Sequence, residues 1–141
     1  MFLVRILFEG NAVNWRVMLV VGVLIIGIGL YTFFTYPSIA IQFPVSFTIG
    51  ADTKQEALEV SVLQSQVRVD VIVATGSTWW TAQILQGDTE VWSHTMTQND
   101  QTVFQSDWIE LPSGSYNFTY SAASLAALDL EVTVTAKGSF W

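Results

Sequence analysis

The stretch IAIQFPVSFTI, residues 39–49, alternates strictly between large apolar side chains and small or polar ones. A period of two is typical of a β-strand with one buried face and one solvated face. The apolar set is Ile39, Ile41, Phe43, Val45, Phe47 and Ile49. Pro44 falls in the outward set and has no backbone N–H to donate, so the pattern predicts a strand at the edge of a sheet.

The same alternation continues to the end of the chain. It predicts further strands at residues 58–62, 67–73, 80–84, 90–96, 102–111, 116–120 and 128–134. Turn signals such as Gly87-Asp88 and Pro112-Ser113-Gly114 separate them. Seven or eight short strands at this spacing predict an all-β fold over residues 37–141, an antiparallel β-sandwich of immunoglobulin-like or jelly-roll type. The chain has no cysteine, so no disulfide supports this core.

Upstream of the first strand, residues 17–34 contain neither charge nor proline. A helix of that length is about 27 Å long, close to the ~30 Å hydrocarbon core of a bilayer. We therefore expect a transmembrane helix over residues 17–36, preceded by a stub over residues 1–16. The run is longer than the core of a secretion signal, which favours a retained signal-anchor. Ser38-Ile39-Ala40 nevertheless has the small-x-small form of a cleavage site, so a leader cut after Ala40 is the alternative.

Basic residues near the predicted span indicate its orientation. Arg5 and Arg16 precede it, whereas the nearest base on the other side is Lys54. Positive residues stay on the cytoplasmic side. This predicts a single-pass protein of the plasma membrane with a cytoplasmic N-terminus and an extracytoplasmic C-terminal domain. The residues expected at the two membrane interfaces are Trp15, Arg16, Tyr31 and Tyr36. The stub suits either the cytoplasmic membrane surface or a partner subunit.

Three glycines in the span predict a helix-packing face. Gly22 and Gly29 are seven residues apart and so lie on one side of a helix, with Gly27 nearby. Small residues let a second helix approach closely in lipid, although no GxxxG motif is present. The expected partners are membrane lipid and other membrane-protein subunits.

Composition excludes several functions. Beyond the span, eleven acidic residues against three basic ones leave a net charge near −8, which would repel nucleic acid. The single histidine, His94, shares a predicted strand face with Trp92 and Met96, and a structural role is expected for it. No catalytic, metal-binding or cofactor-binding residues are predicted, and we expect the protein not to be an enzyme.

Two features suggest a surface role. Trp79 and Trp80 are adjacent, so a strand places them on opposite faces. If Trp80 is in the core, the exposed row predicts an interaction surface, either a subunit contact or a sugar platform; its members are Trp79, Thr81, Gln83 and Leu85. Asn117-Phe118-Thr119 is also a glycosylation sequon, which predicts Asn117 as an acceptor.

The segments WIELPSGSYNFTY, from Trp108, and LDLEVTV, from Leu128, together resemble the end of exported jelly-roll modules of the GOLD and pre-peptidase type. In those modules a Leu-Pro-x-Gly-x-Tyr hairpin precedes the closing strand. The resemblance covers about residues 108–134 and implies an adhesive or accessory role. GOLD proteins usually place the membrane anchor after the β-domain, whereas here the apolar segment comes first.

Together these observations predict a non-catalytic accessory subunit of a larger membrane assembly. Two alternatives remain. A pilin-like filament subunit also joins an apolar N-terminal helix to a β-domain, and an extracellular adhesion or carbohydrate-binding module would use the surface around Trp79.

Overall fold

The computed structural model describes residues 14–75, 79–97, 103–139 and 141. The chain divides into two compact units, Met1–Phe34 and Thr35–Trp141. Helix α2, Asn14–Thr35, is the one helix among the described residues that is long and apolar enough to cross a membrane, a test that a leader sequence also meets. Residues 1–13 of the predicted stub lie outside the described residues.

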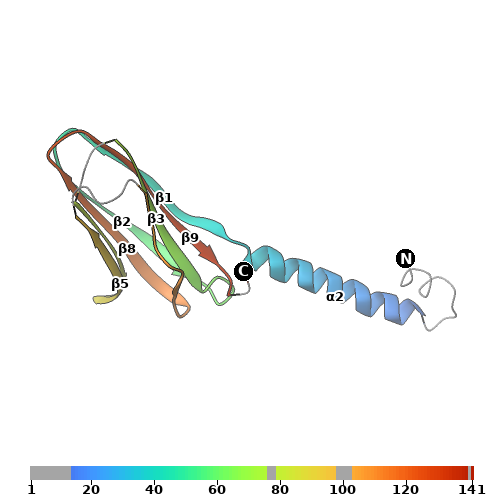
Figure 1. Ribbon diagram of the computed structural model, residues 1–141. Coiled ribbons are helices and arrows are strands. Elements are labelled where there is room, and N and C mark those ends of the chain that lie inside the picture. The colour runs from blue at the N-terminus through green and yellow to red at the C-terminus, as the bar shows by residue number, and fades with distance from the viewer. Residues whose placement is uncertain (1–13, 76–78, 98–102, 140) are drawn as a thin grey trace. The chain divides into compact units, whose positions relative to one another are not determined.

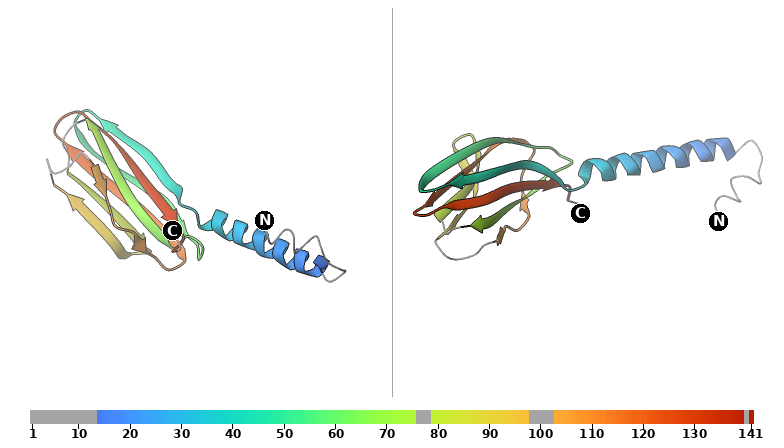
Figure 2. Two further views of the ribbon diagram at one scale, coloured as in Figure 1. Left: turned by 45° about the vertical axis from the view of Figure 1, so that its right-hand side comes forward. Right: turned by 90° about the horizontal axis from the view of Figure 1, so that it is seen from above.

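The second unit is an antiparallel β-sandwich, which confirms the predicted fold class (Figures 1 and 2). Its strands are β1 Ser38–Phe47, β2 Gly50–Val60, β3 Gln66–Thr75, β4 Trp79–Gln86, β5 Thr89–Met96, β6 Val103–Gln105, β7 Ile109–Glu110, β8 Gly114–Ser124 and β9 Leu128–Lys137. One sheet has the order β1-β9-β3-β6, with β7 also paired to β3, and the other has the order β2-β8-β4-β5. This order, with consecutive strands crossing between two sheets, is that of a jelly roll.

The count of nine strands exceeds the predicted seven or eight because the strand expected at residues 102–111 is interrupted. β6 and β7 both pair with β3, on either side of a break at residues 106–108. At the break the backbone N–H of Ser106 donates to the carbonyl of Val69 at 2.9 Å, and the N–H of Val69 donates to Ser106 Oγ at 2.9 Å. A side chain thus takes the place of one rung of the ladder. Counted as one interrupted strand, β6 and β7 bring the sandwich to eight.

The core lies between the two sheets and is filled by the inward set of each strand. The alternation predicted for β3, β4, β8 and β9 is confirmed, because the predicted inward residues are buried, Val73 only partly, and the polar residues that alternate with them are not. Pro44 is exposed on β1, and β1 is an edge strand, also as predicted. The largest fully buried side chains include Tyr120, Phe118, Leu58 and Ile84.

Three residues assigned to buried strand faces are exposed instead. Ile39 lies on the outside because the register between β1 and β9 shifts between Ile39 and Ile41, which turns the residue before the bulge to the other face. Ile49 lies in the connection between β1 and β2, where the chain crosses from one sheet to the other. Val62 follows the end of β2 and lies in the loop 61–65.

The first half of β2 was missed by the sequence pattern. Residues 50–57 show no apolar alternation, yet Asp52, Lys54 and Glu56 pair with Ala122, Tyr120 and Phe118 on the core-facing side of β8. All three charged residues remain accessible because β2 is an edge strand. Inward-pointing charges on an edge strand hinder pairing with a foreign strand.

The β-domain begins with Thr35, which is also the last residue of α2. Thr35 is only 1% exposed. Its carbonyl accepts a hydrogen bond from the N–H of Gly138 at 2.8 Å, and its Oγ1 accepts one from Nε1 of Trp141 at 3.0 Å. Nε2 of Gln64 donates to the carbonyl of Tyr36 at 3.0 Å. We refer to the end of the sandwich formed by Thr35, the loop 61–65, the loop 111–113, Gly138 and Trp141 as the junction end.

Candidate interaction surface

The outer face of the sheet β2-β8-β4-β5 carries the predicted interaction residues. Trp79 is 39% exposed and Trp80 only 2% exposed, so β4 is oriented as the sequence predicts. Thr81, Gln83 and Leu85 alternate with the buried Ala82 and Ile84, and each of the three is half-buried on the outside. These placements put the residues on one face, and their role in binding stays a prediction.

The pairing register shows what surrounds this row. Thr81 lies between Ser121 of β8 and Thr95 of β5, and Gln83 lies between Thr119 and Ser93. β2 adds Thr53 and Gln55 beyond β8. We call this surface the hydroxyl face; its members are Thr53, Gln55, Trp79, Thr81, Gln83, Leu85, Ser93, Thr95, Asn117, Thr119 and Ser121. None of its members is charged.

Side chains on the hydroxyl face bond to one another along the rows. Oγ1 of Thr81 and Oγ1 of Thr95 lie 3.0 Å apart, and Oγ1 of Thr53 lies 3.2 Å from Oγ of Ser121, both within hydrogen-bonding distance. Toward the junction end of this sheet, Glu90 accepts a hydrogen bond from Gln83 at 2.8 Å, and Glu59 accepts one from Ser115 at 2.9 Å. At the other end, Asp52 accepts a hydrogen bond from the N–H of Thr53 at 2.9 Å and lines the hollow beside Trp79. The rows are therefore pre-ordered, which lowers the entropy lost when a partner binds.

A shallow depression lies at the Trp79 end of this face. Its volume is about 260 Å³, and its lining includes Trp79, Thr53, Thr81, Thr95 and Ser121. An indole beside several hydroxyl groups offers both apolar area and hydrogen-bonding partners, a combination common at protein contacts.

The sequon falls on this same surface. Asn117 pairs with Ala57 on one side and Leu85 on the other, so it lies in an inner strand of the sheet and is half-buried. A glycan on Asn117 would cover the row next to Gln83. A molecule that is glycosylated at Asn117 therefore could not also bind a partner through the hydroxyl face.

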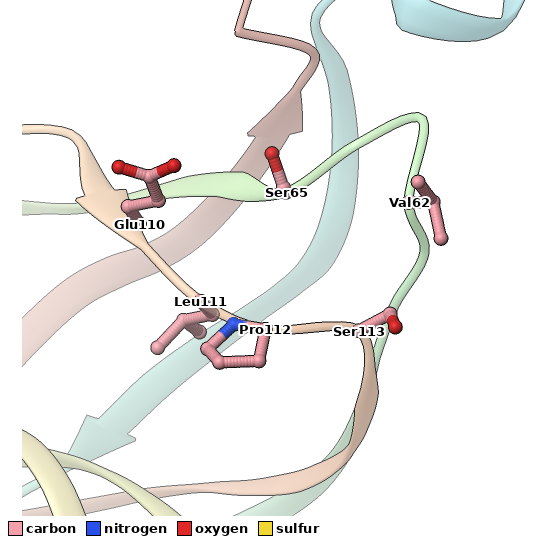
Figure 3. Close-up of a pocket in the computed structure, with 6 residues that line it drawn as sticks. All are labelled: Val62, Ser65, Glu110, Leu111, Pro112 and Ser113. Atoms are coloured by element: carbon pink, nitrogen blue, oxygen red, sulfur yellow. The ribbon is translucent and has the colours of Figure 1, made fainter.

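A second hollow, of about 510 Å³, lies at the junction end (Figure 3). The loop 61–65 forms one side of it with Val62 and Ser65, and the segment from Glu110 to Ser113 forms the other. The N–H of Leu111 donates to the carbonyl of Ser65 at 2.8 Å and holds the two together. Glu110 is the one carboxylate in this lining, and no basic residue joins it there.

His94 lies on the inner side of β5, opposite Ala82. Its ring stacks on Phe104 with centroids 4.1 Å apart, and it lies 5.5 Å from the ring of Trp80. These contacts fit the structural role expected for it. Among the described residues, no group of three or more His, Cys, Asp or Glu side chains is arranged to hold a metal ion.

The three glycines of the predicted helix-packing face lie in α2. No heavy atom of the described chain approaches a Cβ built at Gly22, Gly27 or Gly29 within 4 Å, local helix backbone aside. Trp15, Arg16 and Tyr31 also lie in α2, and Tyr36 lies in the β-domain, where its ring packs edge-on against Trp141 at 5.4 Å.

No protein-family model and no curated protein matches this chain. Among solved structures, the disulfide-linked pili of Bacillus endospore appendages are 14% identical, with 73% of this chain and 89% of that chain covered at a TM-score of 0.39. PirA is 11% identical, with 67% and 92% covered at a TM-score of 0.40. The carbohydrate-binding module CBM36, in complex with calcium and xylotriose, is 13% identical, with 69% and 92% covered at a TM-score of 0.35. At such values the likeness lies in the β-sandwich arrangement, and it says nothing of what this chain does.

Proposed function

We propose that this protein is a single-pass membrane subunit without catalytic activity, which works by contact within a larger assembly. The apolar helix is retained as an anchor with its N-terminus in the cytoplasm. The extracytoplasmic β-domain binds a partner subunit through the hydroxyl face.

The observation that carries this proposal is the burial of Thr35. The last residue of the apolar helix is packed inside the β-domain and bonded by both Gly138 and Trp141. A Cβ at Gly138 would lie 2.6 Å from Cβ of Thr35, so the two backbones need a glycine at this contact. Cutting the chain after Ala40 would remove Thr35 and Tyr36 and the first pairs of β1 with β9. Cleavage after Ala40 would therefore remove residues that the β-domain uses in its own packing, which supports a retained anchor.

Charge supports the contact role. The β-domain as a whole carries a strong negative charge, yet the central rows that make up the hydroxyl face carry none, and Glu59 and Glu90 lie only at their edge toward the junction end. Charged residues are depleted from the centres of protein interfaces, whereas tryptophan is enriched there. If this face only met water, charged side chains like those elsewhere on the domain would make it more soluble.

Anchoring is tested by intact mass and by protease added to intact cells. We expect a full-length chain whose β-domain is degraded after Pro37 while the N-terminal segment is spared. A chain that starts at Ile41 would contradict retention, and a protected β-domain would contradict the orientation.

Assembly is tested by mild detergent extraction followed by native mass measurement. We expect a fixed hetero-complex; a homopolymer would favour a pilin-like filament, and a monomer would contradict the contact role. Gly22→Leu or Gly29→Leu should loosen a partner helix because close approach in lipid requires small residues. Val23→Leu is the matched control, since it changes size in the same segment without filling a glycine position.

A further inference from the structure

We infer that the junction end of the β-domain is itself a membrane-contact surface, which inserts the tip of the loop 61–65 and the indole of Trp141 into the lipid headgroup region. This inference rests on the proposed anchoring by α2. It adds that part of the folded domain, and not only the helix, is built to meet lipid.

The junction end gathers several exposed apolar side chains. Val62 is 81% exposed, and Leu63, Trp141, Tyr36 and Ile39 are also exposed. They come from three segments far apart in the chain, namely the start of β1, the loop after β2 and the chain beyond β9. Apolar side chains gathered in this way mark a surface that meets another apolar phase.

Direct contacts tie these residues to the end of the helix. Nε1 of Trp141 bonds Oγ1 of Thr35 at 3.0 Å, and the rings of Tyr36 and Trp141 lie 5.4 Å apart. A Cβ at Gly138 would lie 2.6 Å from Thr35 and 2.8 Å from the carbonyl oxygen of Leu63, so that loop packs just as closely. Gln64 bonds both the carbonyl of Tyr36, at 3.0 Å, and Oγ of Ser38, at 3.1 Å. The surface is therefore held against the first residues that follow the span.

The dimensions of a membrane indicate that lipid contacts the junction end. The mainly apolar run of the span ends at Phe34 and is followed by Thr35, Tyr36 and Pro37, so Thr35 lies near the hydrocarbon boundary when the span is inserted. The headgroup layer on each side is roughly 5–7 Å thick. Groups in contact with Thr35 cannot lie outside that layer. Tryptophan and tyrosine are the residues that favour it, because their rings are apolar at one side and polar at the other.

The geometry of the loop supports the same assignment. Ser61 and Gln64 form an isolated antiparallel bridge, and the N–H of Gln64 donates to the carbonyl of Ser61 at 3.2 Å. The bridge brings Val62 and Leu63 to the tip of a tight turn. Two apolar residues at the tip of a turn can enter the headgroup region at a lower cost when the polar groups that flank them are bonded inside the protein, as those of Ser61 and Gln64 are.

The absence of cysteine from the chain makes a direct test practical. Val62→Cys, Leu125→Cys and Ile25→Cys each provide one site for a nitroxide label on the full chain in phosphatidylcholine vesicles. Leu125 is the matched control: it is apolar, 75% exposed and in the connection between β8 and β9, at the opposite end of the sandwich. Collisions of each label with lipid-soluble oxygen and with a water-soluble nickel complex report its surroundings.

We expect the ratio of oxygen to nickel collisions to be several-fold higher at Val62 than at Leu125, and highest at Ile25. A label at Val62 as accessible to nickel as the one at Leu125, with Ile25 in lipid, would overturn the inference and leave the anchoring proposal intact. A label at Val62 hidden from both agents would mean that a second copy of the chain covers the loop, which also overturns the lipid assignment. A water-accessible Ile25 would refute the anchoring itself, and this inference with it.

Discussion

On the outside of the sheet β1-β9-β3-β6, charged side chains lie among the neutral ones and several have partners. Nε of Arg68 lies 3.2 Å from Oδ2 of Asp70, and Gln42 donates to Glu131 at 2.7 Å. The ring of Trp108 lies under two cations, with Cζ of Arg68 at 4.8 Å and Nζ of Lys137 at 4.3 Å from its centroid. The hydroxyl face of the other sheet presents neutral side chains and Trp79. The difference supports the proposal that the second sheet, and not the first, binds a partner.

The largest effect is expected from the two tryptophans of β4. Trp80 tests the buried side of this strand and Trp79 tests the exposed side. Trp80→Ala removes a buried indole that packs on Phe104 and Tyr120, with ring centroids 5.2 and 5.7 Å away. It should lower the free energy of unfolding by about 3–5 kcal/mol in chemical denaturation. Trp79→Ala should cost much less stability and instead weaken association in native mass measurements. The reverse pattern would mean that β4 faces the other way.

A pair of lysine substitutions tests directly whether the outer faces of the two sheets differ in partner binding. Thr119→Lys places a charge in the middle of the hydroxyl face, and Thr133→Lys places the same charge in the middle of the charged face, beside Asp70. If the hydroxyl face binds the partner, Thr119→Lys should weaken assembly at least tenfold, or about 1.4 kcal/mol, because a buried interface charge without a partner is costly. Thr133→Lys should leave assembly unchanged. Equal effects would remove the distinction between the two sheets.

The inner side of β8 offers a smaller test, with two buried tyrosines in one strand. The hydroxyl of Tyr116 donates to the carbonyl of Pro112 at 2.6 Å, whereas Oη of Tyr120 has no hydrogen-bond partner within the part of the chain that the structure describes. Tyr116→Phe should lower stability by about 1 kcal/mol, and Tyr120→Phe should be neutral or stabilising by a similar amount. Thermal unfolding of the two variants in parallel gives the comparison.

Tyr120 also predicts an alkaline effect on stability. Burial raises the pKa of Tyr120 well above its ordinary value near 10. Above pH about 10 the unfolded chain loses this proton while the folded chain keeps it, so stability should fall as pH rises through that range. Tyr120→Phe should remove part of that slope, and a slope that is unchanged in the variant would contradict the assignment.

The smallest effect is expected at His94. His94→Gln should loosen the stacking on Phe104 slightly and leave the activity and assembly of the host complex unchanged. A selective loss of turnover with normal assembly would contradict the non-catalytic role.

The inner faces of the strands could be predicted because burial in a sheet depends on each strand's own period. The period placed Trp80 on one face with Ala82 and Ile84, and Trp79 on the opposite face, without knowledge of any neighbour. It failed at residues 50–57, where an edge strand is solvated on both sides, and at Ile39, where a bulge changes the register. Such features depend on which strands become neighbours, and local sequence does not encode that.

The candidate surface was predictable only along β4 for the same reason. Thr53, Thr119 and Thr95 join that row through pairings with β2, β8 and β5. No local pattern in those three strands marks their outer residues as a set. The junction end was missed as a unit because Thr35, Leu63 and Gly138 are distant in the chain.

The position of Ser38-Ile39-Ala40 has a consequence for the order of events during synthesis. These residues open β1, which pairs with β9, the last strand to be made. At about 5–20 residues per second, the roughly 100 residues between them take about 5–20 s to synthesise. During that interval the segment has no strand to pair with and is open to a signal peptidase; afterwards it is locked into a ladder. If the anchor is retained as proposed, pairing of β1 with β9 competes with the peptidase, and a slower ribosome would give the peptidase more time to cut.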